Sequence, residues 1–186
     1  RLVRIIATVG VLLMPLAWFV LKDYQKQRIL VFMNPDIDPF GSGYHIIQSK
    51  IAIGSGTIFG KGLFNGTQSQ LNFLPENHTD FIFSVIGEEL GFIGCIFVLI
   101  LLFMLIYRII KVAYTCNDHF GMLLATGIGS MLCFEVLVNA GMTMGIMPVT
   151  GIPLPFISYG VSALTTNMIS IGILLNISMQ RKKYIF

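Results

Sequence analysis

Long apolar stretches alternate with polar segments along the chain, and four of these stretches have the length of a membrane span. A helix that crosses the hydrocarbon core of a bilayer needs about 17 to 25 mostly apolar residues. The second stretch extends back past the acidic pair Glu88 and Glu89, and Glu135 interrupts the third. The predicted spans are residues 5–21, 81–107, 120–147 and 156–179. The pattern therefore predicts an all-α, multi-pass helix bundle that forms one membrane domain over residues 1–186.

Composition supports a bilayer location. Of the 186 residues, 55% are hydrophobic and 11% are charged, and the mean hydropathy is +0.80. A soluble domain carries about 25% charged residues, so this chain has too few charges to cover a globular surface in water. A soluble enzyme, a disordered tail and a nucleic-acid-binding module are excluded. The chain starts at Arg1 rather than Met, and we expect it to be part of a longer membrane protein.

Basic residues near the span ends predict the orientation, because such residues accumulate on the cytoplasmic side. With four spans, one side receives seven of them: Arg1, Arg4, Arg108, Lys111, Arg181, Lys182 and Lys183. The opposite, extracytoplasmic side then receives the long segment 22–80. This segment contains regularly spaced apolar residues and seven glycines between Gly41 and Gly66. Long loops without regular structure are usually functional or disordered, and we expect this one to fold back over the outer end of the bundle.

A glycine-rich run, GSGTIFGKG at residues 54–62, invites comparison with nucleotide-binding loops. It fails the Walker A pattern, since Ser55 stands at the first glycine position and Gly62 follows Lys61. Two interpretations stay open. The run forms tight turns that use the positive φ of glycine, or its backbone cradles a phosphate with Lys61 as the cation.

The densest polar cluster of the chain, LPENHTDF at residues 74–81, ends where the second span begins. Thr79 or Asp80 could cap this helix by accepting hydrogen bonds from its first amides. Alternatively, Asp80 faces a cavity at the membrane surface and acts as a general base. We favour the second interpretation, because Glu76, His78, Thr79 and Asp80 together exceed what a helix cap needs.

Other polar residues in the apolar stretches give weaker signals. Glu135 and Asn139 are four residues apart and share a helix face. We favour a buried interhelix hydrogen bond here over a proton or ion relay, since an ionisable residue in a span usually faces the protein interior. The histidines show no ligand pair at helical spacing, and the three cysteines show no spacing typical of metal ligands.

Taken together, these segments resemble the SEDS family, and the wording YHIIQSK at residues 44–50 is more similar to its RodA branch than to FtsW. The resemblance covers nearly the whole chain in ordered motifs. They are Tyr24, Gln25 and Arg28; 34–36 and 38–39; 43–56; 60–62; 66–71; 73–76; 78–83; 88–91; Val138, Asn139, Gly141 and Met142; and 151–160.

The resemblance implies a fold of about ten spans, of which the four predicted here form the C-terminal part. It implies peptidoglycan glycosyltransferase activity, which extends glycan strands from lipid II during cell elongation and shape maintenance. The enzyme would lie in the bacterial cytoplasmic membrane with its site on the extracytoplasmic face. Implied partners are the nascent glycan strand, a class B penicillin-binding protein and other membrane proteins of the elongation complex.

The catalytic aspartate of the family maps onto Asp80. Inversion by a single displacement needs one base, whereas a retaining route needs a second carboxylate as nucleophile. Departure of the lipid diphosphate needs positive charge, from a divalent cation such as Mg²⁺ or Mn²⁺ or from basic side chains. Many relatives carry Glu where this chain has Asn72, which leaves the cation open. The expected substrate-binding residues are Arg28, Lys50, Lys61, Gln68, Ser69, Glu76, His78, Thr79, Ser158 and Tyr159.

Three other functions stay open at this stage. A division-specific polymerase similar to FtsW would share the chemistry and differ in its partner. A lipid II flippase would use Glu135 and the broken entrance of the last span to line a path. A scaffold would only dock the transpeptidase, and it would tolerate neutralisation of Asp80.

Overall fold

The computed structural model describes residues 21–34, 37–38, 41–71, 73–74 and 78–180, and every element in this part is a helix. In chain order these are α2 (Asp23–Met33), α3 (Ser42–Ser55), α4 (Thr67–Gln70), α5 (Ile82–Tyr114), α6 (His119–Thr143) and α7 (Val161–Gln180). By length and composition, α5, α6 and α7 can each cross a membrane. The all-α membrane fold is therefore confirmed. The first predicted span, 5–21, lies outside the described residues except for its last position.

The helices differ from the predicted spans mainly at their ends. Helix α6 stops at Thr143 and α7 begins at Val161, so residues 144–160 form an irregular connection rather than the ends of two spans. This connection contains three prolines, and its backbone adopts positive φ at Gly145 (70°), Gly151 (75°) and Phe156 (63°). Proline removes a helical donor and positive φ cannot continue an α-helix, which explains why α6 ends earlier and α7 begins later than predicted.

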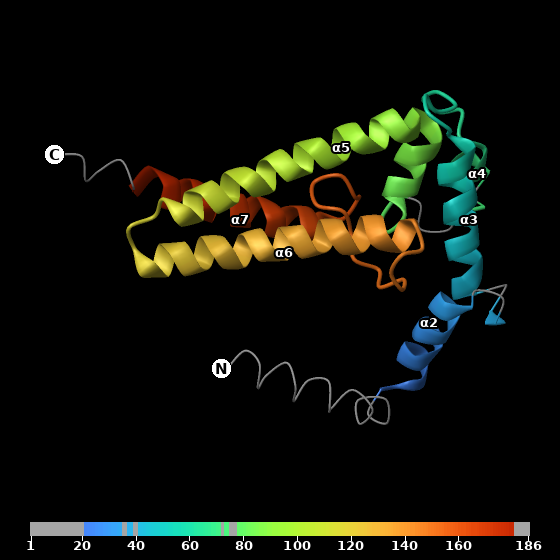
Figure 1. Ribbon diagram of the computed structural model, residues 1–186, viewed down its shortest axis with the longest axis horizontal. Coiled ribbons are helices and arrows are strands. Elements are labelled where there is room, and N and C mark those ends of the chain that lie inside the picture. The colour runs from blue at the N-terminus through green and yellow to red at the C-terminus, as the bar shows by residue number, and fades with distance from the viewer. Residues whose placement is uncertain (1–20, 35–36, 39–40, 72, 75–77, 181–186) are drawn as a thin grey trace.

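Helix α5 is bent at Gly91, where φ is 67° and ψ is −164°. Figure 1 shows the bend at the end of α5 that lies beside α3 and α4. Glycine is required here, because a Cβ on Gly91 would collide with the backbone nitrogen of Gly60. Residues 82–90 therefore leave the line of the long helix and turn across the end of the bundle, and they carry the acidic pair with them.

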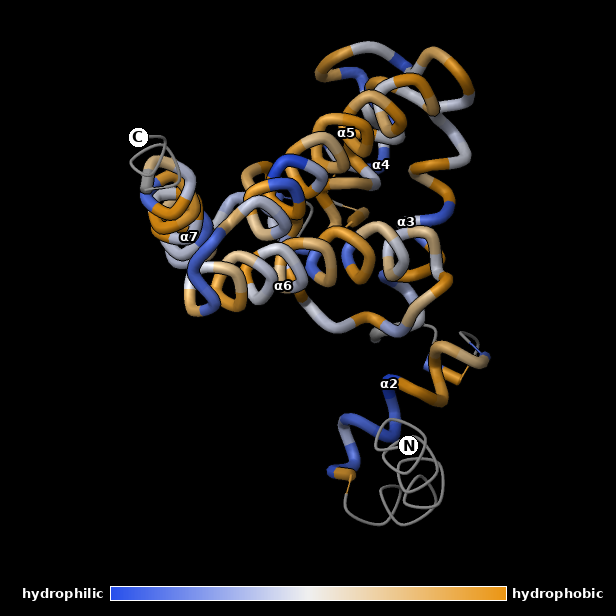
Figure 2. The backbone as a smooth tube through the Cα atoms, turned by 60° about the vertical axis from the view of Figure 1, so that its left-hand side comes forward, coloured by the Kyte–Doolittle hydropathy of each residue, from blue (hydrophilic) through white to orange (hydrophobic). Residues whose placement is uncertain are grey.

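The core lies between the three long helices. One cluster of buried side chains joins α5 and α6 to the connection that follows: Phe83, Cys95, Leu102, Val136, Ala140 and Leu154. A second cluster joins α5, α6 and α7: Ile109, Ala113, Ala125, Ile128, Leu132 and Leu174. Figure 2 shows hydrophobic residues along most of α5 and α6, and many of their large apolar side chains are exposed, among them Phe97, Phe103 and Phe134. An apolar exterior of this kind is what a bilayer or a further helix would cover.

The segment between residues 22 and 80 folds over one end of the bundle, as predicted, with α3 packed against α5 and α6. A buried polar junction fixes this packing. Ser49 Oγ of α3 donates to the carbonyl of Thr143 at 2.6 Å and lies 2.6 Å from Ser84 Oγ of α5. All three residues are fully buried. Because buried hydroxyls must be hydrogen-bonded, this junction specifies how α3 sits on the other two helices.

Candidate catalytic site

Asp80 lies in the turn that leads into α5, and a side chain of α6, Asn139, clamps its backbone by hydrogen bonding. The carbonyl of Asp80 accepts a hydrogen bond from Asn139 Nδ2 at 2.9 Å. The same nitrogen donates to the carbonyl of Ile152 at 2.8 Å. A side-chain amide has two N–H donors, so Asn139 uses both to join the start of α5 to the connection 144–160. Asn139 is fully buried, which makes this clamp inaccessible to water.

A second set of hydrogen bonds ties the same two segments together. Ser158 Oγ donates to the carbonyl of Thr79 at 2.7 Å and accepts from the amide of Leu154 at 2.7 Å. The amide of Tyr159 donates to the carbonyl of His78 at 2.9 Å. Residues far apart in sequence are thus held as one unit. The N-cap position of α5 is Phe81, whose side chain makes no capping hydrogen bond.

The carboxylate of Asp80 lies beside a turn that also receives a cationic side chain. A Cβ on Gly151 would lie 3.2 Å from Asp80 Oδ2, which locates the carboxylate at this glycine. Arg28 Nη1 donates to the carbonyl of Val149 at 3.1 Å. Because Val149 and Gly151 are two residues apart, a guanidinium and a carboxylate approach the same three-residue turn. A carboxylate and a permanent positive charge therefore lie on one short stretch of backbone.

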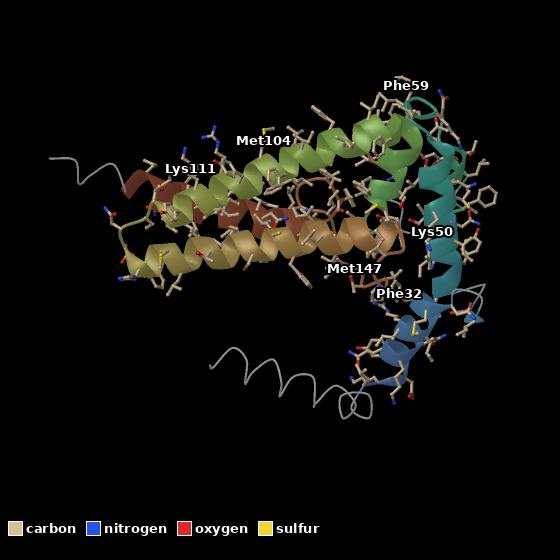
Figure 3. The ribbon with its side chains drawn as sticks, viewed as in Figure 1. Phe32, Lys50, Phe59, Met104, Lys111 and Met147 are labelled. Atoms are coloured by element: carbon tan, nitrogen blue, oxygen red, sulfur yellow. The ribbon has the colours of Figure 1, made fainter. Side chains whose placement is uncertain are left out.

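Lys50 is a second cation at this end of the bundle. It is exposed on α3, and its Cε lies so close to Gly145 that a Cβ there would collide with it. Figure 3 shows Lys50 on α3 near the C-terminal end of α6, where Met147 is also labelled. Lys50 and Arg28 therefore reach the connection 144–160 from two different helices.

A cavity of about 270 Å³ lies next to Asp80 in the chain and is lined by His78, Ile82, Ile157 and Tyr159. Tyr159 and His78 are exposed at its rim. A concave surface with apolar walls and a few polar groups is typical of a small-molecule site. The predicted residues His78 and Tyr159 thus come together in one cavity, whereas Thr79 and Ser158 act as hydrogen-bonding partners of each other.

Three predicted substrate-binding residues lie in a different cluster, built around Glu88. Lys61 Nζ is 2.9 Å from Glu88 Oε1. The amides of Gln68 and Ser69 in α4 donate to the two oxygens of the same carboxylate at 2.9 and 3.1 Å. Glu88 is fully buried and lies eight residues beyond Asp80, about 12 Å along a helix axis. These residues bind a carboxylate of the chain itself, at a distance from the Asp80 turn.

The glycine-rich run at 54–62 forms tight turns, with φ of 78° at Gly60 and 96° at Gly62. This was one of the two interpretations left open. Lys61 points into the Glu88 cluster, and its use as a phosphate-binding cation stays a prediction. Glu76 lies outside the described residues. In the part of the chain that the structure describes, no group of three His, Cys, Asp or Glu side chains comes close enough to hold a metal ion.

Sequence reasoning missed the role of Asn139. Its spacing from Glu135 suggested a hydrogen bond between helices, and Asn139 does bond outside its own helix, but to the main chain at Asp80 and Ile152. An asparagine in an apolar span was the available signal, since a buried amide must find partners. Its partners could not be identified, because they lie 59 and 13 residues away in sequence.

Separate comparisons with known proteins indicate the same family. Residues 1–183 match the family described as "Cell cycle protein", which groups FtsW, RodA and SpoVE. The chain is 49% identical over 183 residues to peptidoglycan glycosyltransferase MrdB of Escherichia coli K12, covering 98% of this chain and 50% of that protein. It is 48% identical over 162 residues to peptidoglycan glycosyltransferase RodA of Treponema pallidum, covering 87% and 37%. It is 46% identical over 181 residues to a probable FtsW of Geobacter metallireducens, covering 96% and 48%.

Solved structures agree with this result. The chain matches a protein from a study of the coordination of polymerization and crosslinking by a peptidoglycan synthase complex, with a TM-score of 0.74 and 32% identity over 98% of this chain and 49% of that one. It also matches a variant of the rod shape determining protein RodA of Thermus thermophilus, with a TM-score of 0.56 and 37% identity over 67% and 39%. The chain spans about half the length of the curated relatives it matches. The chain belongs to the FtsW, RodA and SpoVE family, the SEDS family, and within it is RodA-like.

Proposed function

We propose that the full-length protein is a peptidoglycan glycosyltransferase that extends glycan strands from lipid II during cell elongation and shape maintenance. The observation that carries the proposal is the Asp80 carboxylate held beside Gly151, on the turn that Arg28 also reaches. Relatives at 48 and 49% identity are named peptidoglycan glycosyltransferases, which supports the same reaction. The protein would lie in the bacterial cytoplasmic membrane with this site on the extracytoplasmic face.

In this reaction a hydroxyl of one glycan attacks the anomeric carbon of another, which is α-linked to a lipid diphosphate. Asp80 takes the proton of the attacking hydroxyl, the new β-1,4 bond forms, and the bond from the anomeric carbon to the diphosphate breaks. A single inverting displacement needs only one base. Glu88, the nearest other acidic residue along α5, is buried and engaged by Lys61 and two amides, which argues against a second carboxylate acting as nucleophile.

The leaving diphosphate carries negative charge, which Arg28 and Lys50 would stabilise from either side of the connection 144–160. Arginine suits this role because its planar guanidinium can donate two hydrogen bonds to one phosphate. A divalent cation such as Mg²⁺ or Mn²⁺ would supply the same kind of charge. Such a cation is commonly held by one or two carboxylates together with the substrate's own phosphates, and the proposal leaves its use open.

The cavity lined by His78, Ile82, Ile157 and Tyr159 is the proposed site for a sugar ring. Thr79 and Ser158 would act by shaping this cavity, since their hydrogen bond joins its two walls. Glu76 and the cluster of Lys61, Gln68 and Ser69 remain expected contacts of the longer glycan or lipid. A class B penicillin-binding protein is the proposed partner, which is consistent with a relative in a complex that coordinates polymerization and crosslinking.

The test is to incubate labelled lipid II with the purified full-length protein and its transpeptidase partner, and to separate the products by size. We expect long glycan polymer. Movement of lipid II across vesicles without polymer would instead favour the transport function. Depletion in cells then separates the two family roles: rounding of the cells is expected for elongation, whereas filaments would show a division role.

A further inference from the structure

The loop between α3 and α4 has the reverse of the polarity expected for a loop in water. Its four large apolar side chains are exposed, by 57% at Ile58, 80% at Phe59, 62% at Leu63 and 79% at Phe64. We call these four residues the apolar rim. The one charged residue between positions 54 and 66 is Lys61, and it turns inward to the buried carboxylate of Glu88. The loop thus hides its charge and presents its hydrophobic groups.

Hydrogen bonds to α5 prevent the apolar rim from collapsing onto the protein. The amides of Lys61 and Gly62 donate to the carbonyls of Glu88 and Glu89, each at 3.0 Å. The backbone on the other side of the loop is paired as well, because the amides of Phe92 and Ile93 donate to the carbonyls of Thr57 and Ile58 at 3.0 and 3.2 Å. The backbone of the loop is therefore held against α5 by hydrogen bonds on both sides, while its apolar side chains project outward.

The same hydrogen bonds fix the depth of the loop relative to the membrane. Residues 90–107 of α5 contain no charge, and this is the most hydropathic of the candidate spans. Phe92 and Ile93, at the start of this apolar stretch, are exposed on the surface of α5. Since both are bonded to the loop, the apolar rim lies at the level where α5 enters its apolar stretch. Figure 3 labels Phe59 at the outer edge of the loop, beside the bend of α5.

We propose that the loop 57–64 is a membrane-surface anchor, whose apolar rim inserts into the boundary between headgroups and acyl chains around α5. Lipid is the favoured occupant because the rim continues the exposed apolar surface of α5 through Phe92 and Ile93, at the depth where hydrocarbon begins. Apolar side chains presented at this depth bind the interface in proportion to the area they bury. The anchor would hold Glu88, and with it α4, at a constant height above the bilayer.

The test places the photo-reactive amino acid benzoylphenylalanine at position 59 or 64 of the full-length protein, in vesicles of phosphatidylethanolamine and phosphatidylglycerol. After illumination, mass spectrometry identifies what each position has bound. A matched control carries the same group at Gln70, a polar, exposed residue at the end of α4. We expect lipid adducts at 59 and 64 in more than about tenfold excess over 70, as follows from the transfer of an aromatic side chain to hydrocarbon.

Crosslinks from positions 59 and 64 into the protein's own polypeptide or into an added partner protein would overturn the proposal. Equal lipid yields at all three positions would overturn it as well. A second test uses a natural aromatic residue, which disturbs the fold less than benzoylphenylalanine does. It introduces Phe59→Trp or Phe64→Trp, with Trp18 and any other tryptophan replaced by Phe. Quenching of the new tryptophan by brominated lipids is the expected result, and fluorescence that these lipids leave unchanged contradicts the anchor.

Discussion

Replacing Asn139 by Ala should slow strand synthesis while leaving lipid II binding intact. The change removes both hydrogen bonds that join Asp80 and Ile152, at 2.9 and 2.8 Å. Two buried carbonyls lose their donor, so the free energy of unfolding should fall by about 2–4 kcal/mol. Asp80 keeps its carboxylate, but the backbone that carries it is no longer held in a fixed position. A shift of about 1 Å in a catalytic group can cost about 100-fold in rate, so we expect kcat to fall about 10- to 100-fold.

The assay is the initial rate of polymer formation by the full-length protein, with lipid II binding measured separately on the same samples. Asn139→Leu tests hydrogen bonding apart from side-chain volume, because leucine nearly keeps the shape of asparagine and has no donor. We expect it to behave like the alanine variant. Asn117→Ala is the matched control, since Asn117 is exposed in the connection between α5 and α6, and it should leave kcat unchanged.

A native kcat in Asn139→Ala, together with a lowered unfolding temperature, would show that the clamp stabilises the fold without positioning Asp80. A loss confined to lipid II binding would also refute the reasoning, because Asn139 is buried and cannot contact the substrate.

Further predictions concern Gly151 beside Asp80, the Glu88 cluster and the positive charge of Arg28. Gly151→Ala should lower kcat, because Gly151 has φ of 75° and a new Cβ would crowd Asp80 Oδ2 at 3.2 Å; Gly127→Ala, in open space on α6, should leave the rate unchanged. Glu88→Ala removes a buried carboxylate that binds two amides and a lysine, and thermal unfolding in detergent should show a loss of about 3 kcal/mol. Arg28→Met should lower kcat more than it raises KM for lipid II, because the guanidinium stabilises the charge that develops on the leaving diphosphate; an unchanged kcat would remove Arg28 from this role.

The membrane fold was predictable because hydrophobic length and the scarcity of charge are properties of the sequence itself. The ends of the helices were less predictable. The bend at Gly91 depends on a close approach to Gly60, which is a contact between residues 31 positions apart. The early end of α6 at Thr143 depends on positive φ at Gly145 and Gly151, which apolar periodicity does not report.

The site was predictable in part. The polar cluster before α5 drew attention to Asp80, and the resemblance to the family supplied a role for it. Distances could not be foreseen: the sequence offered Lys61 as a phosphate-binding cation, and its pairing with Glu88 is visible only in the structure. Arg28 was a candidate from the sequence, but its contact with Val149, which lies 121 residues away, could not be predicted. Contacts of this range are set by tertiary packing and leave no periodic signal in the sequence.

The most direct test of the central claim compares native full-length protein with Asp80→Asn and Asp80→Glu for polymer formation and for lipid II binding. We expect all three proteins to bind lipid II, the native protein to form polymer, Asp80→Glu to form less, and Asp80→Asn to form none. Polymer from Asp80→Asn at the native rate would contradict the assignment of Asp80 as the base.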